Sequence, residues 1–122
     1  RGLLTGSKPT GKGDFRKHLP RFSGEAGKKN AEIVAKIEGF AKERGMTPAQ
    51  VTLGWVLAKQ PKLVPLLGMR TRAQLDDALG ALEKTLTQED VAALEAIVPK
   101  GAIEGTRYAE AQMAHLDSEK RA

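Results

Sequence analysis

Residues 63–82, with the sequence LVPLLGMRTRAQLDDALGAL, constrain the fold of this chain more than any other segment. An apolar run at 63–67 lies between Pro61 and Gly68, and a helical pattern with leucines on one side follows from about Arg72 to Leu82. A short apolar run between turn signals is typical of a strand that is buried on both faces of a parallel sheet. Strands that alternate with helices favour an α/β layout over a helical bundle.

The rest of the sequence adds a second strand and further helices. We expect a strand at 2–5 and then a long basic loop at 6–29, in which glycines and prolines exclude one long regular element. Hydrophobic periodicity predicts a weak helix after Tyr108 and four longer helices at about 30–44, 48–59, 72–82 and 88–98. The 122 residues fit a single domain, 1–122.

The helix predicted at 48–59 is apolar on nearly every side. Thr47 can cap its first turn, and Pro48 suits the first helical position because the amide hydrogen that proline lacks would be unpaired there. Leu53, Trp55 and Leu57 point in different directions around the helix axis. A helix without a polar face requires extensive neighbours, so we expect it to be buried on several sides.

Positive charge gathers near the start of the chain. The net charge is +5, and residues 1–30 contain eight lysines and arginines but only two acids, Asp14 and Glu25. Such a segment can meet the phosphates of a nucleic acid or of a nucleotide cofactor, and it can equally be a solvated loop. The chain has no cysteine and no run of 18 apolar residues, which indicates a cytoplasmic protein without disulfides and without a membrane partner.

The junction between the strand at 63–67 and the next helix is a candidate phosphate site. Gly68 permits close approach of a ligand to the backbone, and Arg70 adds a charged planar group before the start of the helix. Arg70, Gln74 and Asp77 share one side of the helical pattern, apart from the leucine side that is expected to face the core, which comprises Leu75, Leu79 and Leu82. The alternative is an ordinary strand-to-helix turn with a solvated polar face.

Other motifs give weaker evidence for a binding or catalytic function. GSKPTGKG at 6–13 resembles a nucleotide-triphosphate loop, but Gly13 stands where a magnesium-binding hydroxyl is needed. The helices at 30–44 and 48–59 mimic a helix-turn-helix, yet the second helix offers apolar side chains where base-reading ones are required. His18 and His115 are far apart and are expected at the surface. No residues assemble a catalytic centre or a metal site.

Taken together, these segments resemble the C-terminal third of an aldo-keto reductase, a family of (β/α)8-barrel, nicotinamide-dependent carbonyl reductases. RGLLTG resembles the seventh barrel strand, DFRKHLPRFSGE the loop after it, and residues 47–82 the seventh helix, the eighth strand and the following helix. LTQEDVAALEAI resembles the C-terminal helix of the family. The resemblance implies an α/β fold that is the end of a TIM barrel, with two parallel strands and about four to five helices.

The resemblance also implies an NADP(H) site. Arg70 would face the 2′-phosphate, Gln74 and Asp77 would lie on the adenine side, and the strand and loop at the start would cover the pyrophosphate. The full set of implied cofactor-binding residues is Gly2, Leu3, Ser7, Arg16, Gly68, Arg70, Gln74, Asp77 and Ala78. Asp77-Ala78 replaces the glutamate-asparagine pair usual in the family, and Met69 replaces a small or hydroxyl residue. Cofactor binding is therefore expected either to be weaker or to depend more on Arg70.

The implied activity is the reduction of an aldehyde or ketone to an alcohol by hydride from the nicotinamide. The catalytic Asp, Tyr, Lys and His of the family come from earlier strands, so we assign no catalytic residue and expect this chain to be inactive alone. We also expect it to depend on other chains or on a preceding segment, to self-associate, or to be marginally stable. Two alternatives are a non-catalytic nucleic-acid-binding module and a catalytically silent relative of the reductases.

Overall fold

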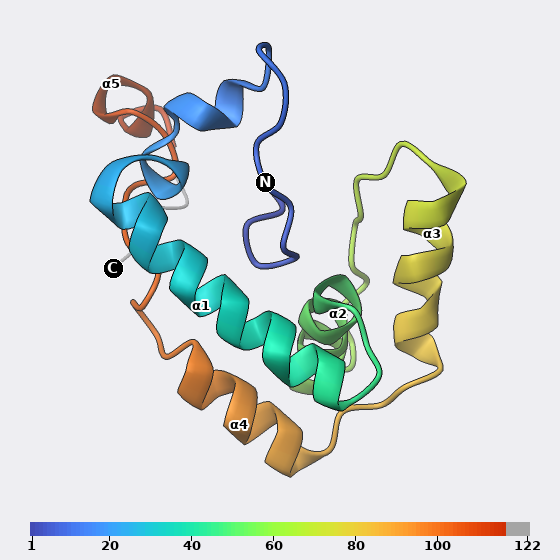
Figure 1. Ribbon diagram of the computed structural model, residues 1–122. Coiled ribbons are helices and arrows are strands. Elements are labelled where there is room, and N and C mark those ends of the chain that lie inside the picture. Colours follow the sequence, from blue (N-terminus) through green and yellow to red (C-terminus); the bar gives the residue numbers. More distant parts are fainter. Residues whose placement is uncertain (117–122) are drawn as a thin grey trace.

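The computed structural model describes residues 1–116 as a set of helices joined by irregular segments (Figure 1). The longer helices confirm the four predicted helical segments, and a short helix follows Tyr108 as predicted. The α-helices are α1 (Gly24–Glu43), α2 (Pro48–Lys59), α3 (Arg72–Leu79), α4 (Gln88–Ile97) and α5 (Glu110–Met113). The short 3-10 helices are η1 (Phe15–His18), η2 (Pro20–Phe22) and η3 (Gly80–Leu82).

The two predicted strands are absent from the part of the chain that the structure describes. Residues 3–6 form a turn, and 63–70 is irregular chain without sheet pairing. A strand requires a neighbouring strand to receive its backbone hydrogen bonds, and no described segment lies beside 63–70 in that way. The prediction of two parallel strands is therefore not confirmed in residues 1–116, because an apolar pattern alone does not provide a pairing partner.

The apolar side chains around this segment are correspondingly exposed. Val64 is 90% exposed and Leu66 99%, although the sequence predicted a strand buried on both faces. The leucine side of α3, predicted to face the core, is also open, with Leu79 at 51% and Leu82 at 67%. In Figure 1, α3 stands apart from α1 and α4, and its leucine side chains are only partly covered within residues 1–116.

The hydrophobic core lies between α1, α2 and α4. Ile37, Phe40 and Ala41 of α1 pack with Val51 of α2 and with residues of the α4 region, namely Leu86, Val91 and Leu94. Trp55, expected in the core, packs at its edge and is half-buried. Of the α2 residues only Val51 and Gly54 are buried, so residues 1–116 do not supply the neighbours that burial on several sides of this helix requires.

Helix α1 begins at Gly24, inside the segment predicted as the end of the basic loop. Gly24 and Gly27 suggested a loop because glycine disfavours a helix by about 1 kcal/mol relative to alanine. Gly27 is needed here for another reason: a Cβ at this position would lie 2.7 Å from the backbone carbon of Phe22. Close packing of α1 on η2 therefore outweighs the local propensity.

A buried asparagine ties the chain after α4 to the start of α1. Asn30 is fully buried, and its Nδ2 donates to the carbonyl oxygens of Arg21 and Glu104, each at 2.9 Å. Its Oδ1 accepts from the Glu104 amide at 2.9 Å. A surface ion pair between Lys29 and Glu104, 2.8 Å long, lies beside this link.

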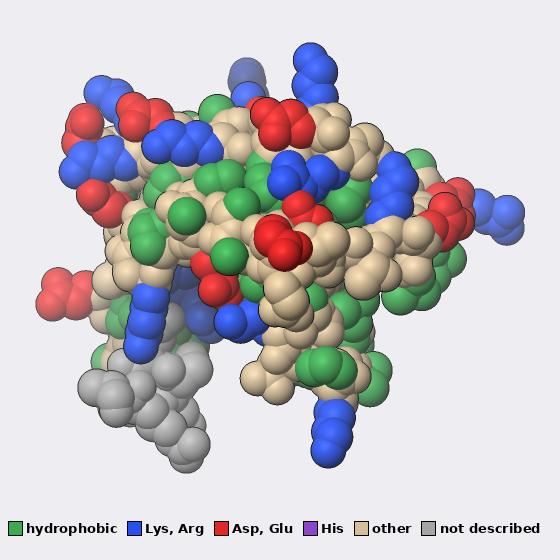
Figure 2. Space-filling view, turned by 90° about the horizontal axis from the view of Figure 1, so that it is seen from below, with side chains coloured by type: hydrophobic (Ala, Val, Ile, Leu, Met, Phe, Trp, Pro, Cys, Tyr) green, Lys and Arg blue, Asp and Glu red, His purple; other side chains and the backbone are tan. Residues whose placement is uncertain are grey.

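Charges of both signs are distributed over the helical surface. Figure 2 shows basic and acidic side chains interspersed with hydrophobic ones on the face seen from below, without a single basic patch. Arg44 and Asp90 pair across α1 and α4 at 2.7 Å, and Lys59 and Glu95 pair across α2 and α4 at 3.0 Å. Within residues 1–116 no helix has the length and apolar character needed to cross a bilayer.

Candidate functional site

Two adjoining open clefts bring together most of the residues predicted to bind the cofactor. The first has a volume of about 710 Å³ and lies among the N-terminal turn, α2, the segment at 63–69 and α3. Its lining includes six of the predicted residues, namely Gly2, Ser7, Gly68, Gln74, Asp77 and Ala78. The second, of about 660 Å³, is lined by Ser7, Arg16 and Arg70 among others. Ser7 belongs to both clefts, which makes them neighbours.

Leu3 is the one predicted residue that lines neither cleft. It is half-buried and faces a separate hollow between the N-terminal turn and α1, together with Val34 and Glu38. The turn that contains it is held by its own backbone, since the amide of Ser7 donates to the carbonyl of Gly2 at 3.1 Å. The structure therefore separates Leu3 from the other eight residues.

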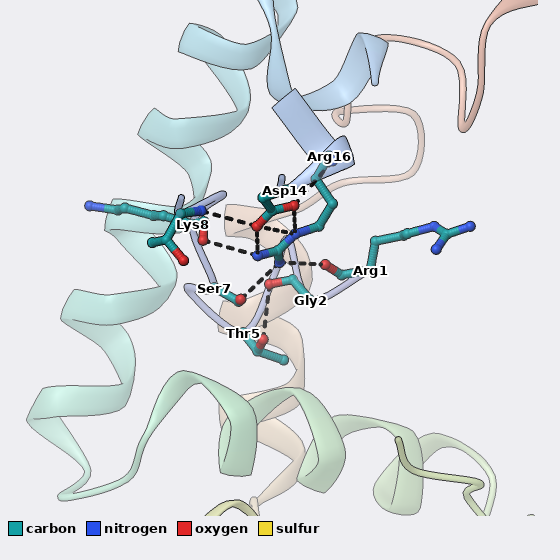
Figure 3. A network of polar contacts seen from close by, with 8 residues as sticks. Arg1, Gly2, Thr5, Ser7, Lys8, Asp14 and Arg16 are labelled. Atoms are coloured by element: carbon teal, nitrogen blue, oxygen red, sulfur yellow. Dashed lines mark hydrogen bonds and ion pairs between the residues drawn. The ribbon is translucent and has the colours of Figure 1, made fainter. Parts of the chain in front are cut away.

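Arg16 is the centre of a polar network that holds the N-terminal segment in place (Figure 3). Its Nη1 donates to the Ser7 hydroxyl at 2.9 Å and to the Arg1 carbonyl at 3.2 Å. Its Nη2 donates to the Lys8 carbonyl at 3.0 Å and to Asp14 Oδ2 at 2.7 Å, and its Nε donates to Asp14 Oδ1 at 3.0 Å. The five N–H donors of this guanidinium thus all have acceptors inside the protein.

The same network fixes the charge state of the Arg16–Asp14 pair. The Arg16 guanidinium hydrogen-bonds the Asp14 carboxylate and holds the pKa of Asp14 well below its usual range. The Thr10 amide also donates to this carboxylate, at 3.0 Å, and pulls the pKa of Asp14 in the same direction. Because Asp14 neutralises Arg16, this arginine contributes little net positive charge to the cleft.

Arg70 contrasts with Arg16. It is exposed, and its guanidinium has no hydrogen-bond or ion-pair partner among residues 1–116. Its backbone is fixed, since the Arg70 amide donates to Oε1 of Gln74 at 2.7 Å. Gln74 also completes a capping box with Thr71 at the start of α3. The main chain at Arg70 is therefore held while its charge stays available to an anion.

Gln74 and Asp77 both have structural partners in addition to lining the cleft. Gln74 Oε1 is occupied by the amides of Arg70 and Thr71. Asp77 Oδ1 accepts from the hydroxyl of Thr47 at 2.8 Å. The adjacent Ala78 provides no polar side chain, so part of the hydrogen-bonding capacity on this side of the cleft is already used inside the protein.

Gly68 lies in open space at the rim of the first cleft. A Cβ added to it would meet no described atom within 4 Å, and its φ is outside the left-handed region. Internal packing therefore does not account for a glycine here. Met69 beside it is half-buried and also lines the cleft.

Several residues that hold the walls of the clefts in place were not predicted from the sequence. Thr47 was assigned only as a helix cap, and Asp14 and Gln50 were given no role. The spacing of Asp14 and Arg16 was the one local signal for their pairing, whereas the link between Thr47 and Asp77 spans 30 residues and has no sequence signature. His18 and His115 are exposed as predicted. Nowhere in residues 1–116 do three or more potential metal ligands cluster.

The tail contacts the start of the chain through an arginine between two rings. The Arg1 guanidinium lies over Phe15 at 5.1 Å and over Tyr108 at 5.0 Å from the ring centroids, and it donates to the Tyr108 hydroxyl. Arg1 also lines the first cleft. Tyr108 is half-buried, and its contacts with Arg1 hold the tail against the start of the chain.

Comparisons with known proteins agree with the resemblance. The chain is 34% identical over 122 residues to aldo-keto reductase str7 of Strobilurus tenacellus, covering 97% of this chain and 36% of the relative. It is 34% identical over 112 residues to aldo-keto reductase yakc of Schizosaccharomyces pombe, whose name carries NADP(+), covering 88% of this chain and 33% of that protein. Probable aldo-keto reductase 1 of Glycine max is 40% identical over 89 residues, or 73% and 26% of the two chains.

The chain spans about a third of the length of these curated relatives. No solved structure matches it. The sequence profile of the Aldo/keto reductase family matches residues 1–99, which contain the clefts and all nine predicted cofactor residues. On this match and on these relatives, the chain belongs to the aldo/keto reductase family of oxidoreductases.

Proposed function

We propose that this chain supplies the adenosine-phosphate side of an NADP(H) site in an oxidoreductase that reduces aldehydes or ketones to alcohols. One observation carries the proposal: eight of the nine residues predicted from the family resemblance line two adjoining clefts, although they come from segments about 60 residues apart. The chain would form the end of a (β/α)8 barrel, from the seventh strand onward.

The residues present fit an anionic dinucleotide. Each cleft has a volume within the range of roughly 300–1,000 Å³ that is common for small-molecule sites. Arg70 offers a guanidinium that has no partner among residues 1–116. It lies beside the start of α3, where backbone N–H groups and the helix dipole also favour an anion. The open space at Gly68 leaves room for a ligand close to the backbone.

The cofactor, when bound, supplies the hydride. The part of this chain is to bind and to orient: Arg70 would hold the 2′-phosphate, and the Ser7 hydroxyl, which accepts from Arg16, can donate its own proton to a pyrophosphate oxygen. We propose no proton donor or acceptor for the carbonyl group among the residues described. We therefore propose that the chain by itself does not turn over substrate.

Isothermal titration of the purified chain with NADPH and with NADH tests this proposal. Arg70→Ala should weaken NADPH binding roughly ten- to a hundredfold, the effect expected for lost charge-assisted hydrogen bonds, and should leave NADH binding nearly unchanged. Arg72→Ala is the matched control, because Arg72 is an exposed arginine two residues along that lines neither cleft. Equal NADPH affinity in the Arg70 variant and in the unsubstituted chain would refute the phosphate role.

A further inference from the structure

Helix α3 is attached to the body of the protein by polar contacts more than by hydrophobic packing. Its Leu75 and Leu79 side chains are 42% and 51% exposed, and none of its residues is fully buried. The next buried side chain along the sequence is Ala81, in the η3 turn that follows. The direction of α3 over the cleft therefore depends on a small number of specific contacts with α2.

Those contacts are concentrated at the first turn of α2. The Thr47 hydroxyl donates to Asp77 Oδ1 at 2.8 Å, and Gln50 Nε2 donates to the Asp77 carbonyl at 3.0 Å. A Cβ on Gly80 would lie 2.5 Å from Gln50 Nε2, so glycine at the end of α3 leaves room for the Gln50 amide. Thr47 and Gln50, at the start of α2, thus hold the side chain and the backbone carbonyl of Asp77 in α3.

Thr47 and Gln50 form the capping box of α2 at the same time. Thr47 Oγ1 accepts from the Gln50 amide at 3.1 Å, and Gln50 Oε1 accepts from the Thr47 amide at 3.1 Å. Each side chain therefore uses its acceptor to cap α2 and its donor to hold α3. The cap holds both side chains in one orientation, so the start of α2 sets the position of α3.

The position of α3 in turn sets the position of Arg70. Gln74 lies one turn before Asp77 on α3, and its Oε1 accepts from the Arg70 amide at 2.7 Å. A shift of α3 at Asp77 would therefore move the backbone at Arg70 with the helix. From this continuous link we infer that Thr47 and Gln50 are positioning residues for recognition of the 2′-phosphate by Arg70, and that Asp77 acts through Thr47. The inference rests on the proposed NADP(H) function.

The test measures the ratio of NADPH affinity to NADH affinity in the purified chain by isothermal titration. Thr47→Val removes the hydroxyl while keeping the shape of the side chain, and it should lower this ratio about tenfold, the scale of one hydrogen bond to a charged group. Thr47→Ser, which keeps the hydroxyl, should restore it. A general loss of stability would lower both affinities together and leave the ratio unchanged.

Thr87→Val is the matched control for the lost helix cap. Thr87 and Asp90 form the same kind of capping box at the start of α4, and Thr87 lines neither cleft. This variant loses an equivalent cap and should keep the ratio of the unsubstituted chain. A double-mutant cycle adds a second measurement: the effects of Thr47→Val and Asp77→Ala should not add, because each breaks the same hydrogen bond.

The outcomes separate this inference from the proposed function. An unchanged ratio in Thr47→Val, with a lowered ratio in Arg70→Ala, would overturn the positioning role and leave the NADP(H) site in place. Additive effects of Thr47→Val and Asp77→Ala would overturn the claim that Asp77 acts through Thr47. Unchanged NADPH binding in Arg70→Ala would instead refute the proposed function itself.

Discussion

Replacing Asn30 with alanine should destabilise the chain far more than replacing an exposed neighbour such as Lys29. The side chain is fully buried and makes three hydrogen bonds, two to carbonyl oxygens and one from a backbone amide. At about 1 kcal/mol net for each bond, Asn30→Ala should lower the free energy of unfolding by about 3 kcal/mol. For a chain of this size that corresponds to a fall in Tm of roughly 10–15 °C.

Urea denaturation, monitored by the fluorescence of the single tryptophan, measures this fall in the free energy of unfolding directly. Hydrogen exchange adds a local readout, since the Glu104 amide should lose protection in Asn30→Ala while amides of α4 keep theirs. Lys29→Ala is the control: it removes the adjacent Lys29–Glu104 ion pair, whose side chains are 53% and 44% exposed, and should cost less than about 1 kcal/mol. A loss in Asn30→Ala no larger than in Lys29→Ala would refute the reasoning.

Four further predictions concern the clefts, the acid side of the stability profile and the state of the chain. Arg16→Lys should weaken NADPH binding and NADH binding by a similar factor, because lysine has three donors and cannot replace the five contacts of the arginine. A titration in which only NADPH binding is weakened would contradict this. Gly68→Ala should weaken NADPH binding yet leave the unfolding free energy within about 1 kcal/mol, so a large fall in Tm would show a packing role instead. The pKa of Asp90 is lowered first by the Thr87 amide and next by Arg44. The Asp90 carboxylate therefore stabilises the fold above pH about 3.9, and this stabilisation is lost as the pH falls through the lower pKa of the folded state. Denaturation at several pH values should show that the free energy of unfolding of Asp90→Asn falls less steeply in acid. Because several leucines are exposed, we expect the chain to self-associate or to be marginally stable. A monomer in sedimentation, with the urea m-value of a full domain, would contradict this expectation.

The helices and their starts followed from sequence pattern because their determinants are local. Thr47 and the TQED segment at 87–90 predicted helix starts, and both carry capping boxes in the structure. The N-terminal part of α1 was missed because Gly24 and Gly27 oppose a helix locally, whereas packing on η2 favours one. The strands were predicted from apolar runs whose pairing partners no sequence pattern can supply.

By itself, the sequence indicated the family and the helical segments, because motifs, caps and periodicity act over a few neighbouring residues. The family resemblance also singled out eight of the residues that line the two clefts. Only the tertiary structure decided which of those side chains remain available to a ligand. Arg16 and Arg70 are both predicted cofactor residues, yet the fold occupies every donor of Arg16 and leaves the guanidinium of Arg70 unpaired within residues 1–116. Contacts between distant residues, such as that of Thr47 with Asp77, arise only when the helices pack, and they set which polar atoms are already satisfied.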